Sequence, residues 1–323
     1  MNPTEIYSAV AFYGFSPSPK MAENLYNCII EIFDQLGHPP DKIGVGAPGF
    51  GDQLISFSRG SAKLTRQGFS NIQHIDLCST LPDAKILSSD CYCSVCFSIK
   101  DSYVILVAQE SLARLSGDSL LPLAKNLIEF IKPCYGIGYY RERQYGPDVY
   151  ALGINQGGPL IAPSEVQEQK RHISRWCDTG MVEEVYHQGL IRDVYPWNFL
   201  TAPQLERPVN GAPLQDWIQA DSSRGKLSCI TDAVMLWEVE DAQAPAIRSV
   251  LWDAGIIFDW RKFNEDEPSE RLSPEESLRR VLEDAQSKGV DLSDLQVLRG
   301  GSGAEVPTAE LKKLLKKPRR SKK

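Results

Sequence analysis

The stretch CYCSVCFSIKDSYVILVAQ, residues 91 to 109, decides the fold class. Its two apolar runs, 91–99 and 102–109, read as strands, and Lys100-Asp101 between them suits a hairpin turn. Strands joined by so short a connection run antiparallel, because a parallel pair needs a crossover of a dozen or more residues. The stretch therefore predicts an antiparallel sheet.

Further elements extend this pattern on both sides. Ser18-Pro19 supplies an N-cap and a first-turn proline, after which apolar residues recur at helical spacing until Gly37. The other predicted strands are 6–15, 53–58, 72–78, 134–143, 148–155, 225–230, 233–240 and 256–263, and the other predicted helices are 119–132, 164–187 and 245–254. The predicted fold class is α+β, with largely antiparallel sheets, packed helices and a flexible charged C-terminal tail.

The composition divides the chain into three portions. We expect an N-terminal α+β portion at 1–160 and a C-terminal α+β portion at 161–263, which can be continuous with the first. After Phe263 the sequence becomes a charged linker, a polar helix pattern and a basic tail, at 264–323. The folded body is therefore expected to end near residue 263.

Three glycines have the spacing of a dinucleotide-binding loop. Gly44, Gly46 and Gly49 match G-x-G-x-x-G, but such a loop needs a buried strand before it and a helix directly after it. The residues that follow alternate like a strand, so we expect a glycine-rich turn and no cofactor. Asp76 stands at the distance of a ribose-binding acid, which keeps the dinucleotide alternative open.

Cysteines and histidines give no clear catalytic or metal site. Cys91, Cys93 and Cys96 are close in sequence, but strand alternation sends the first two to one face and Cys96 to the other. We expect buried structural thiols and no metal. No nucleophile motif is present, so no catalytic residue is assigned, and a Cys177–His172 pair one helical turn and a residue apart stays open.

Two segments are candidates for binding. Tyr195, Trp197 and Phe199 lie together in the segment 192–209, which we expect to be an irregular connection, and they form either an exposed partner-binding patch or an aromatic plug beneath it. The tail is a basic amphipathic segment that could touch nucleic acid or anionic lipid, or a disordered solubilising end. Its candidate contact residues are Lys312, Lys313, Lys316, Lys317, Arg319 and Arg320.

The charge is unevenly distributed. The chain has 35 basic and 42 acidic residues, and eight of the basic ones lie in the last twelve positions, so the remainder carries 27 minus 42, or −15. An acidic body repels nucleic acid and attracts a basic protein, which leaves the tail as the only nucleic-acid contact. No long apolar run or signal peptide is evident, and the thiols suit a reducing compartment, so we expect a cytoplasmic protein without a membrane span.

The N-terminal arrangement resembles that of a known class of proteins. The strand YSAVAFYGF, the helix PKMAENLYNCIIEIFDQLG and the later segment YGIGYYRERQYGPDVYALGI resemble cytoplasmic immunity proteins of bacterial polymorphic-toxin systems. The resemblance implies a non-catalytic protein that binds and neutralises a partner toxin, and an acidic body would suit a basic toxin. The alternatives are a nucleic-acid-associated subunit that uses the basic tail, and an enzyme of unrecognised type with a polar site between the sheet and the proline-rich connection.

Overall fold

The computed structural model describes residues 4–16, 18–51, 53–82, 90–115, 119–153 and 183–259. All of them belong to the first of two compact units, Met1–Phe263, the second being Asn264–Lys323. Within the described residues, no helix is both long and apolar enough to span a membrane.

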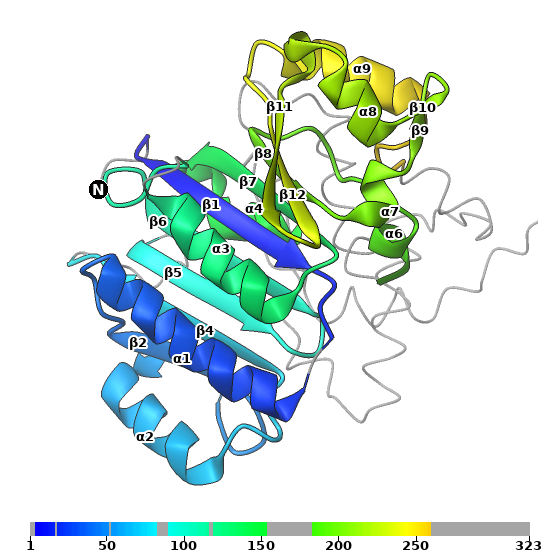
Figure 1. The fold of residues 1–323 in the computed structure, drawn as a ribbon. Helices are drawn as coiled ribbons and strands as arrows, with labels where there is room; N and C mark the ends of the chain where they lie inside the picture. Colours follow the sequence, from blue (N-terminus) through cyan, green and yellow to red (C-terminus); the bar gives the residue numbers. More distant parts are fainter. Residues whose placement is uncertain are drawn as a thin grey trace, which may run out of the picture. The chain divides into compact units, whose positions relative to one another are not determined.

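One antiparallel sheet of ten strands organises the described residues (Figure 1), in the order β11-β12-β8-β7-β1-β6-β5-β4-β2-β3. Its strands are β1 Ile6–Tyr13, β2 Lys42–Gly46, β3 Ile55–Ser56, β4 His74–Thr80, β5 Cys91–Ser98, β6 Tyr103–Gln109, β7 Tyr135–Glu142, β8 Trp197–Leu200, β11 Lys226–Thr231 and β12 Val234–Glu238. The short strands β9 Pro208–Val209 and β10 Ala212–Pro213 form a separate pair. The predicted α+β class with a largely antiparallel sheet is confirmed.

Helices cover both faces of the sheet. The helices are α1 Pro19–Gln35, α2 Phe57–Gln67, α3 Leu120–Ile131, α4 Pro147–Leu152, α6 Glu183–His187, α7 Ala202–Leu205, α8 Leu214–Gln219 and α9 Ala244–Asp253, with 3₁₀ turns η1 Arg143–Tyr145 and η2 Ser222–Arg224. Strand β1 shows the division of the core, because Val10 and Phe12 face α1 and α3 while Ala9 and Ala11 face the opposite layer. Strands from both the N-terminal and the C-terminal portions join the one sheet.

The predicted hairpin at 91–109 forms, but its connection comprises residues 99–102 and is longer than the predicted Lys100-Asp101 turn. Ser98 pairs with Tyr103 across strands β5 and β6. Within the turn, the Ser98 hydroxyl accepts a hydrogen bond from the Asp101 N–H at 3.0 Å and donates to the Asp101 carboxylate at 2.9 Å. Helix α1 also begins as predicted, with the Ser18 hydroxyl accepting from the Met21 N–H at 3.1 Å.

Residues 57–67, part of which was predicted as strand, form helix α2. The alternation of ISFS indicated a strand over 53–58, yet β3 contains only Ile55 and Ser56. Gly60 explains the difference: a Cβ there would lie 2.2 Å from Ile43 Cγ2 of β2, so the glycine lets the helix pack directly on the strand. Close packing therefore overrides the low helix propensity of glycine.

Residues 148–155 were also wrongly predicted as a strand, because residues 147–152 form helix α4. Pro147 stands in the first turn of the helix, where its missing N–H costs nothing, and Gly153 ends it in the left-handed region at φ 77°. The remaining residues, 154 and 155, lie outside the described residues. Gly146 and Pro147, which looked like turn residues, are therefore the start of a short helix, and Gly153 of the predicted strand is its end.

The glycine motif is divided between a strand and the predicted turn, because Gly49 lies in a turn closed by the hydrogen bond from the Phe50 N–H to the Ala47 carbonyl at 3.0 Å. Gly44 and Gly46 belong to β2 and pair with Asp76 and His74 of β4. A Cβ on Gly46 would lie 2.1 Å from the His74 ring, so the glycine leaves room for the imidazole. Strand β3 is the next element, whereas a dinucleotide loop would lead straight into a helix.

The C-terminal portion differs from prediction in two places. The supposedly irregular segment 192–209 contains β8, an internal strand that pairs with β7 and β12. Residues 256–259 of the last predicted strand form only an isolated bridge between Ile257 and Ile191, and 260–263 lie outside the described residues. Most of the predicted helix 164–187 also lies outside them, apart from α6.

Candidate functional site

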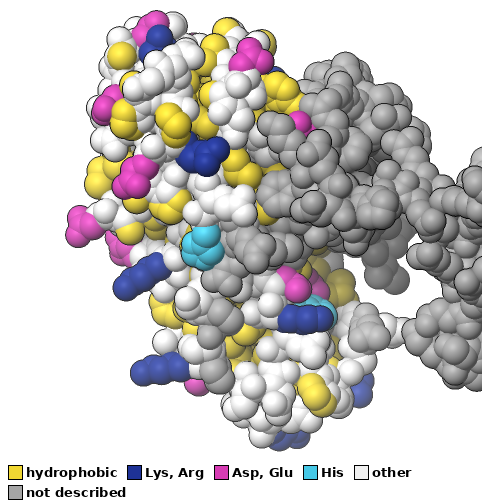
Figure 2. Space-filling model, turned by 90° about the vertical axis from the view of Figure 1, so that its right-hand side faces the viewer, with side chains coloured by type: hydrophobic (Ala, Val, Ile, Leu, Met, Phe, Trp, Pro, Cys, Tyr) yellow, Lys and Arg dark blue, Asp and Glu magenta, His cyan; other side chains and the backbone are white. Residues whose placement is uncertain are grey.

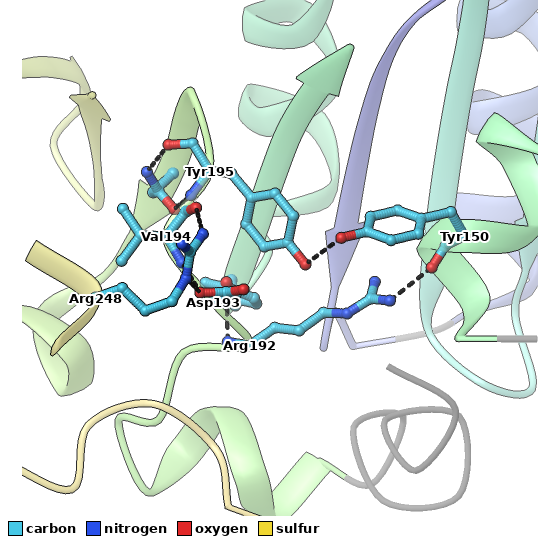
Figure 3. Close-up of polar contacts among 8 residues, drawn as sticks. Tyr150, Arg192, Asp193, Val194, Tyr195 and Arg248 are labelled. Carbon is cyan, nitrogen blue, oxygen red and sulfur yellow. Dashed lines mark hydrogen bonds and ion pairs between the residues drawn. The ribbon is translucent and has the colours of Figure 1, made fainter. Parts of the chain in front are cut away.

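A cluster of tyrosines surrounds Arg192 on the face of the sheet that carries α4. The members of this tyrosine cluster are Tyr13, Tyr135, Tyr139, Tyr150, Tyr186 and Tyr195. Tyr150 belongs to α4, and its hydroxyl lies 3.3 Å from that of Tyr195 (Figure 3). Burial raises the pKa of Tyr13 to about 12, so this phenol is neutral at physiological pH.

Arg192 joins the segment after α6 to the end of α4. Its side chain is fully buried, and its Nη1 and Nη2 donate to the carbonyls of Ala151 at 3.0 Å and Tyr150 at 2.6 Å. These carbonyls belong to the last turn of α4, where a cation is favoured by the helix dipole. The guanidinium also lies 4.7 Å from the Tyr150 ring centre. Arg192 therefore acts as a C-terminal cap from a distant segment.

The next residue links the same segment to α9. Asp193 Oδ1 accepts a hydrogen bond from Arg248 Nε at 2.6 Å and from the Val194 N–H at 2.7 Å (Figure 3). Arg248 Nη2 also donates to the Val194 carbonyl at 3.3 Å. The run 192–194 is thus attached on one side to α4 and on the other to α9.

The three aromatic residues proposed from sequence lie in the core. Tyr195 and Trp197 are each 5% exposed and Phe199 is 0% exposed. Phe199 contacts Phe12 of β1, with ring centres 5.0 Å apart, and Trp197 at 6.2 Å. These three residues therefore do not form an exposed patch, because β8 is internal to the sheet. A role for them in partner binding stays an untested prediction.

All four arginines of residues 183–259 are directed towards main-chain carbonyls. Besides Arg192 and Arg248, Arg224 donates to the Trp217 carbonyl at 2.6 Å and lies 4.4 Å from the centre of that ring. Arg207 donates to the carbonyls of Gln188 and Gly255 at 3.4 and 3.3 Å. Their guanidinium groups are thus used to hold the fold together.

Among the carboxylates of the same portion that the structure describes, seven are exposed, whereas Asp193 is directed to Arg248. Residues 183–259 contain five basic and twelve acidic side chains, so their net charge is 5 minus 12, or −7. The exposed ones, which we call the acidic surface, are Glu206, Asp216, Asp221, Asp232, Glu240, Asp241 and Asp253. On the face drawn in Figure 2, acidic side chains are scattered over the upper part, while most of the Lys and Arg lie lower.

The acidic surface borders one end of the sheet. Strand β11 is terminal in the strand order and pairs only with β12 among the described strands. Asp221 precedes the 3₁₀ turn that leads into β11, and Asp232 follows directly after its last residue. The outer peptide groups of β11 are therefore flanked by carboxylates at both ends.

A second polar group lies at the opposite end of the sheet. His74 and Asp76 are both nearly half exposed, with Nε2 and Oδ2 3.9 Å apart, and Asp76 pairs across strands with Cys96. Burial, with a further contribution from Asp76, raises the pKa of the Cys96 thiol well above its ordinary value. Cys96 is therefore a protonated thiol and a poor nucleophile.

Cys93 and Cys96 lie on opposite faces of the sheet, as expected from strand alternation, whereas the pairing of β5 with β4 shifts register between Cys91 and Cys93. Cys93 belongs to the core on the α1 side, whereas Cys96 packs against the core on the other side of the sheet. Within the described ranges, no group of three or more His, Cys, Asp or Glu side chains is placed to hold a metal ion. His172 and Cys177 lie outside those ranges.

The proposed tail contacts also lie outside the described residues. They are Lys312, Lys313, Lys316, Lys317, Arg319 and Arg320.

Comparison with known proteins gives one structural likeness. No family model matches the chain, and no curated protein matches it in sequence. Among solved structures, the chain is similar to the Pseudomonas aeruginosa T6SS protein PA0821, with 13% identity and a TM-score of 0.45 over 79% of this chain and 73% of that one.

Proposed function

We propose that this protein is a non-catalytic binding protein that neutralises a basic partner protein docked on the acidic surface. The observation that carries the proposal is the opposite orientation of the two kinds of charge in residues 183–259. The four arginines donate to main-chain carbonyls, while seven carboxylates are exposed. In its finer form, the proposal is an immunity protein that acts on a toxin in the cytoplasm.

The charge arrangement favours fast and selective binding. A partner with a basic binding site is attracted to the acidic surface before contact, which raises the association rate, whereas an acidic protein or a nucleic acid is repelled. Salt screens this attraction, so the association rate should fall as ionic strength rises. A toxin that itself binds nucleic acid would carry such a basic site.

The test begins with identification of the partner. The tagged full-length protein is used to capture proteins from its own host after nuclease treatment, and bound proteins are identified by mass spectrometry. A basic protein recovered in near-stoichiometric amount is then purified for rate measurements. If no such protein is recovered, the proposal is rejected.

A charge-neutralised variant then tests the surface itself. We expect Asp216→Asn, Asp221→Asn, Asp232→Asn and Asp241→Asn together to lower the association rate at least tenfold at low salt, with little change in the dissociation rate. Asparagine can still accept the hydrogen bond that Asp221 receives from the Ser223 N–H.

The matched control removes the same amount of charge from the other part of the molecule. Glu23→Gln, Glu31→Gln and Asp34→Asn lie on α1, and Glu129→Gln lies on α3, all at exposed positions. This variant should associate at nearly the wild-type rate. Equal losses in both variants would show a general effect of net charge and would contradict docking on the acidic surface.

A further inference from the structure

Strand β11 offers hydrogen-bonding groups at the end of the sheet. Among the described strands it pairs only with β12, so alternate N–H and C=O groups face outward along its second edge. Lys226 and Cys229 are exposed on this strand. The ligand that matches such a row of donors and acceptors is another extended peptide, which lies about 4.8 Å away in a sheet.

The charges around this edge select the kind of peptide. Lys226 pairs across strands with Glu238, so its charge is offset within the sheet. Asp232 is exposed directly after the strand, and Asp221 is exposed just before the 3₁₀ turn that leads into it. An incoming strand of about six residues, roughly 20 Å long, would span both carboxylates, and lysines near its ends would face them.

The same edge contains features that oppose indiscriminate pairing. The pairing of β11 with β12 shifts register between Cys229 and Thr231, and such irregularities interrupt the ladder that a neighbouring strand would follow. Only the part Lys226–Cys229 has regular pairing. A partner therefore needs favourable charges as well as an extended backbone, which is a source of specificity.

We propose that β11 is the docking edge for the partner, and that an extended lysine-rich segment of the partner adds to the sheet as an eleventh strand. The inference rests on the proposed function and deepens it, because it assigns the partner a conformation and a place. The strand's backbone provides the hydrogen bonds, and the acidic surface provides the charge complementarity.

A synthetic peptide tests the proposal without knowledge of the partner. The probe is a capped octapeptide, Lys-Val-Lys-Thr-Lys-Val-Lys-Thr, and the control replaces every lysine with glutamate. Binding to the full chain is measured by fluorescence anisotropy, and its position by backbone amide exchange. We expect the lysine peptide to bind at least tenfold more tightly than the control and to slow exchange of β11 amides. Equal binding of the two peptides, or protection confined to other elements, would overturn the proposal.

A pair of proline variants isolates the outer edge. Neighbouring residues of a strand direct their N–H groups to opposite sides, so one of Ser228→Pro and Cys229→Pro removes an outward N–H and the other removes a bond to β12. The melting temperature distinguishes them, because the variant that loses the β12 bond is the less stable. The more stable variant should lose peptide binding at least tenfold.

The outcomes separate this inference from the proposed function. If the more stable proline variant binds the peptide as tightly as wild type, strand addition at β11 is wrong, whereas docking on the acidic surface is untouched. If neither proline variant retains its fold, amide exchange in the wild-type protein tests strand addition instead, and β11 amides that the peptide does not protect would overturn it. Peptide binding that is unaffected by neutralisation of Asp221 and Asp232 would overturn the charge part of the inference.

Discussion

Replacing Arg192 with methionine tests whether this residue holds the C-terminal portion to α4. Methionine fills much of the same buried volume but cannot donate to the carbonyls of Ala151 and Tyr150, now bonded at 3.0 and 2.6 Å. The Ala151 carbonyl keeps the hydrogen bond from the Tyr13 hydroxyl at 2.8 Å, and the Tyr150 carbonyl keeps that from the Gly153 N–H at 3.0 Å. The change therefore removes two charge-assisted hydrogen bonds, worth about 1.5–3 kcal/mol each. Removal of the buried cation regains part of its desolvation cost, so we expect a net loss of about 3 kcal/mol in the free energy of unfolding.

The loss should appear as a lower melting temperature. For a domain of this size, about 3 kcal/mol corresponds to a fall of roughly 6–12 °C, measured by near-ultraviolet circular dichroism and by urea unfolding. The control is Arg114→Met, since the Arg114 side chain is 70% exposed and pairs only loosely with Glu110 at 3.7 Å. That change should cost under about 1 kcal/mol. If the melting temperatures of the two variants differ by less than about 2 °C, the capping role of Arg192 is refuted.

Three further predictions concern separate parts of the fold. Burial raises the pKa of Tyr13 to about 12 and also raises the pKa values of Tyr139, Tyr186 and Tyr195, so these phenols ionise first in the unfolded chain. Each contributes about 1.4 kcal/mol per pH unit, so the free energy of unfolding should fall by more than about 1.4 kcal/mol per pH unit between pH 10 and 12. Urea titrations that show no fall would contradict this. Gly46→Ala should displace the half-exposed His74 ring and shift its NMR signals, while the free energy of unfolding changes by under about 1 kcal/mol. Unchanged His74 signals would argue against the close approach of the ring to Gly46. Phe199→Ala should cost about 3–5 kcal/mol in urea unfolding, and a cost typical of a surface residue would contradict its burial.

Elements with a clear period were predictable from the sequence. The hairpin at 91–109 and the helix that begins after Ser18 both depend on local signals, namely polar turn residues and a capping hydroxyl. Helix α3 likewise buries the apolar residues that recur at helical spacing. In these segments local preference and tertiary packing agree.

The errors arose where tertiary contacts decide the local structure. Gly46 looked like a turn residue and Gly60 followed a predicted strand, yet each glycine is required because a neighbouring side chain occupies the space of a Cβ. Trp197 looked irregular because Pro196 precedes it, whereas its strand is held between β7 and β12. No sequence signal shows that a strand is internal, since its partners lie far away in the chain.

The candidate site was predictable in charge but not in geometry. The net acidity of the body is visible in the composition, and it led to the expectation of a basic partner. The inward direction of Arg192 and Arg248 depends on carbonyl and carboxylate groups supplied by distant segments. Equally, the exposed edge of β11 emerges only once the order of all ten strands is known.

The central position of β1 has a consequence for synthesis of the chain. This first strand lies between β6 and β7, and Tyr13 pairs with Tyr103, 90 residues later. At about 5–20 residues per second, the ribosome needs roughly 5–18 s to make that partner. During this interval the apolar run Ala9–Phe12 has neither of its partner strands, and an unpaired apolar strand favours association with other chains.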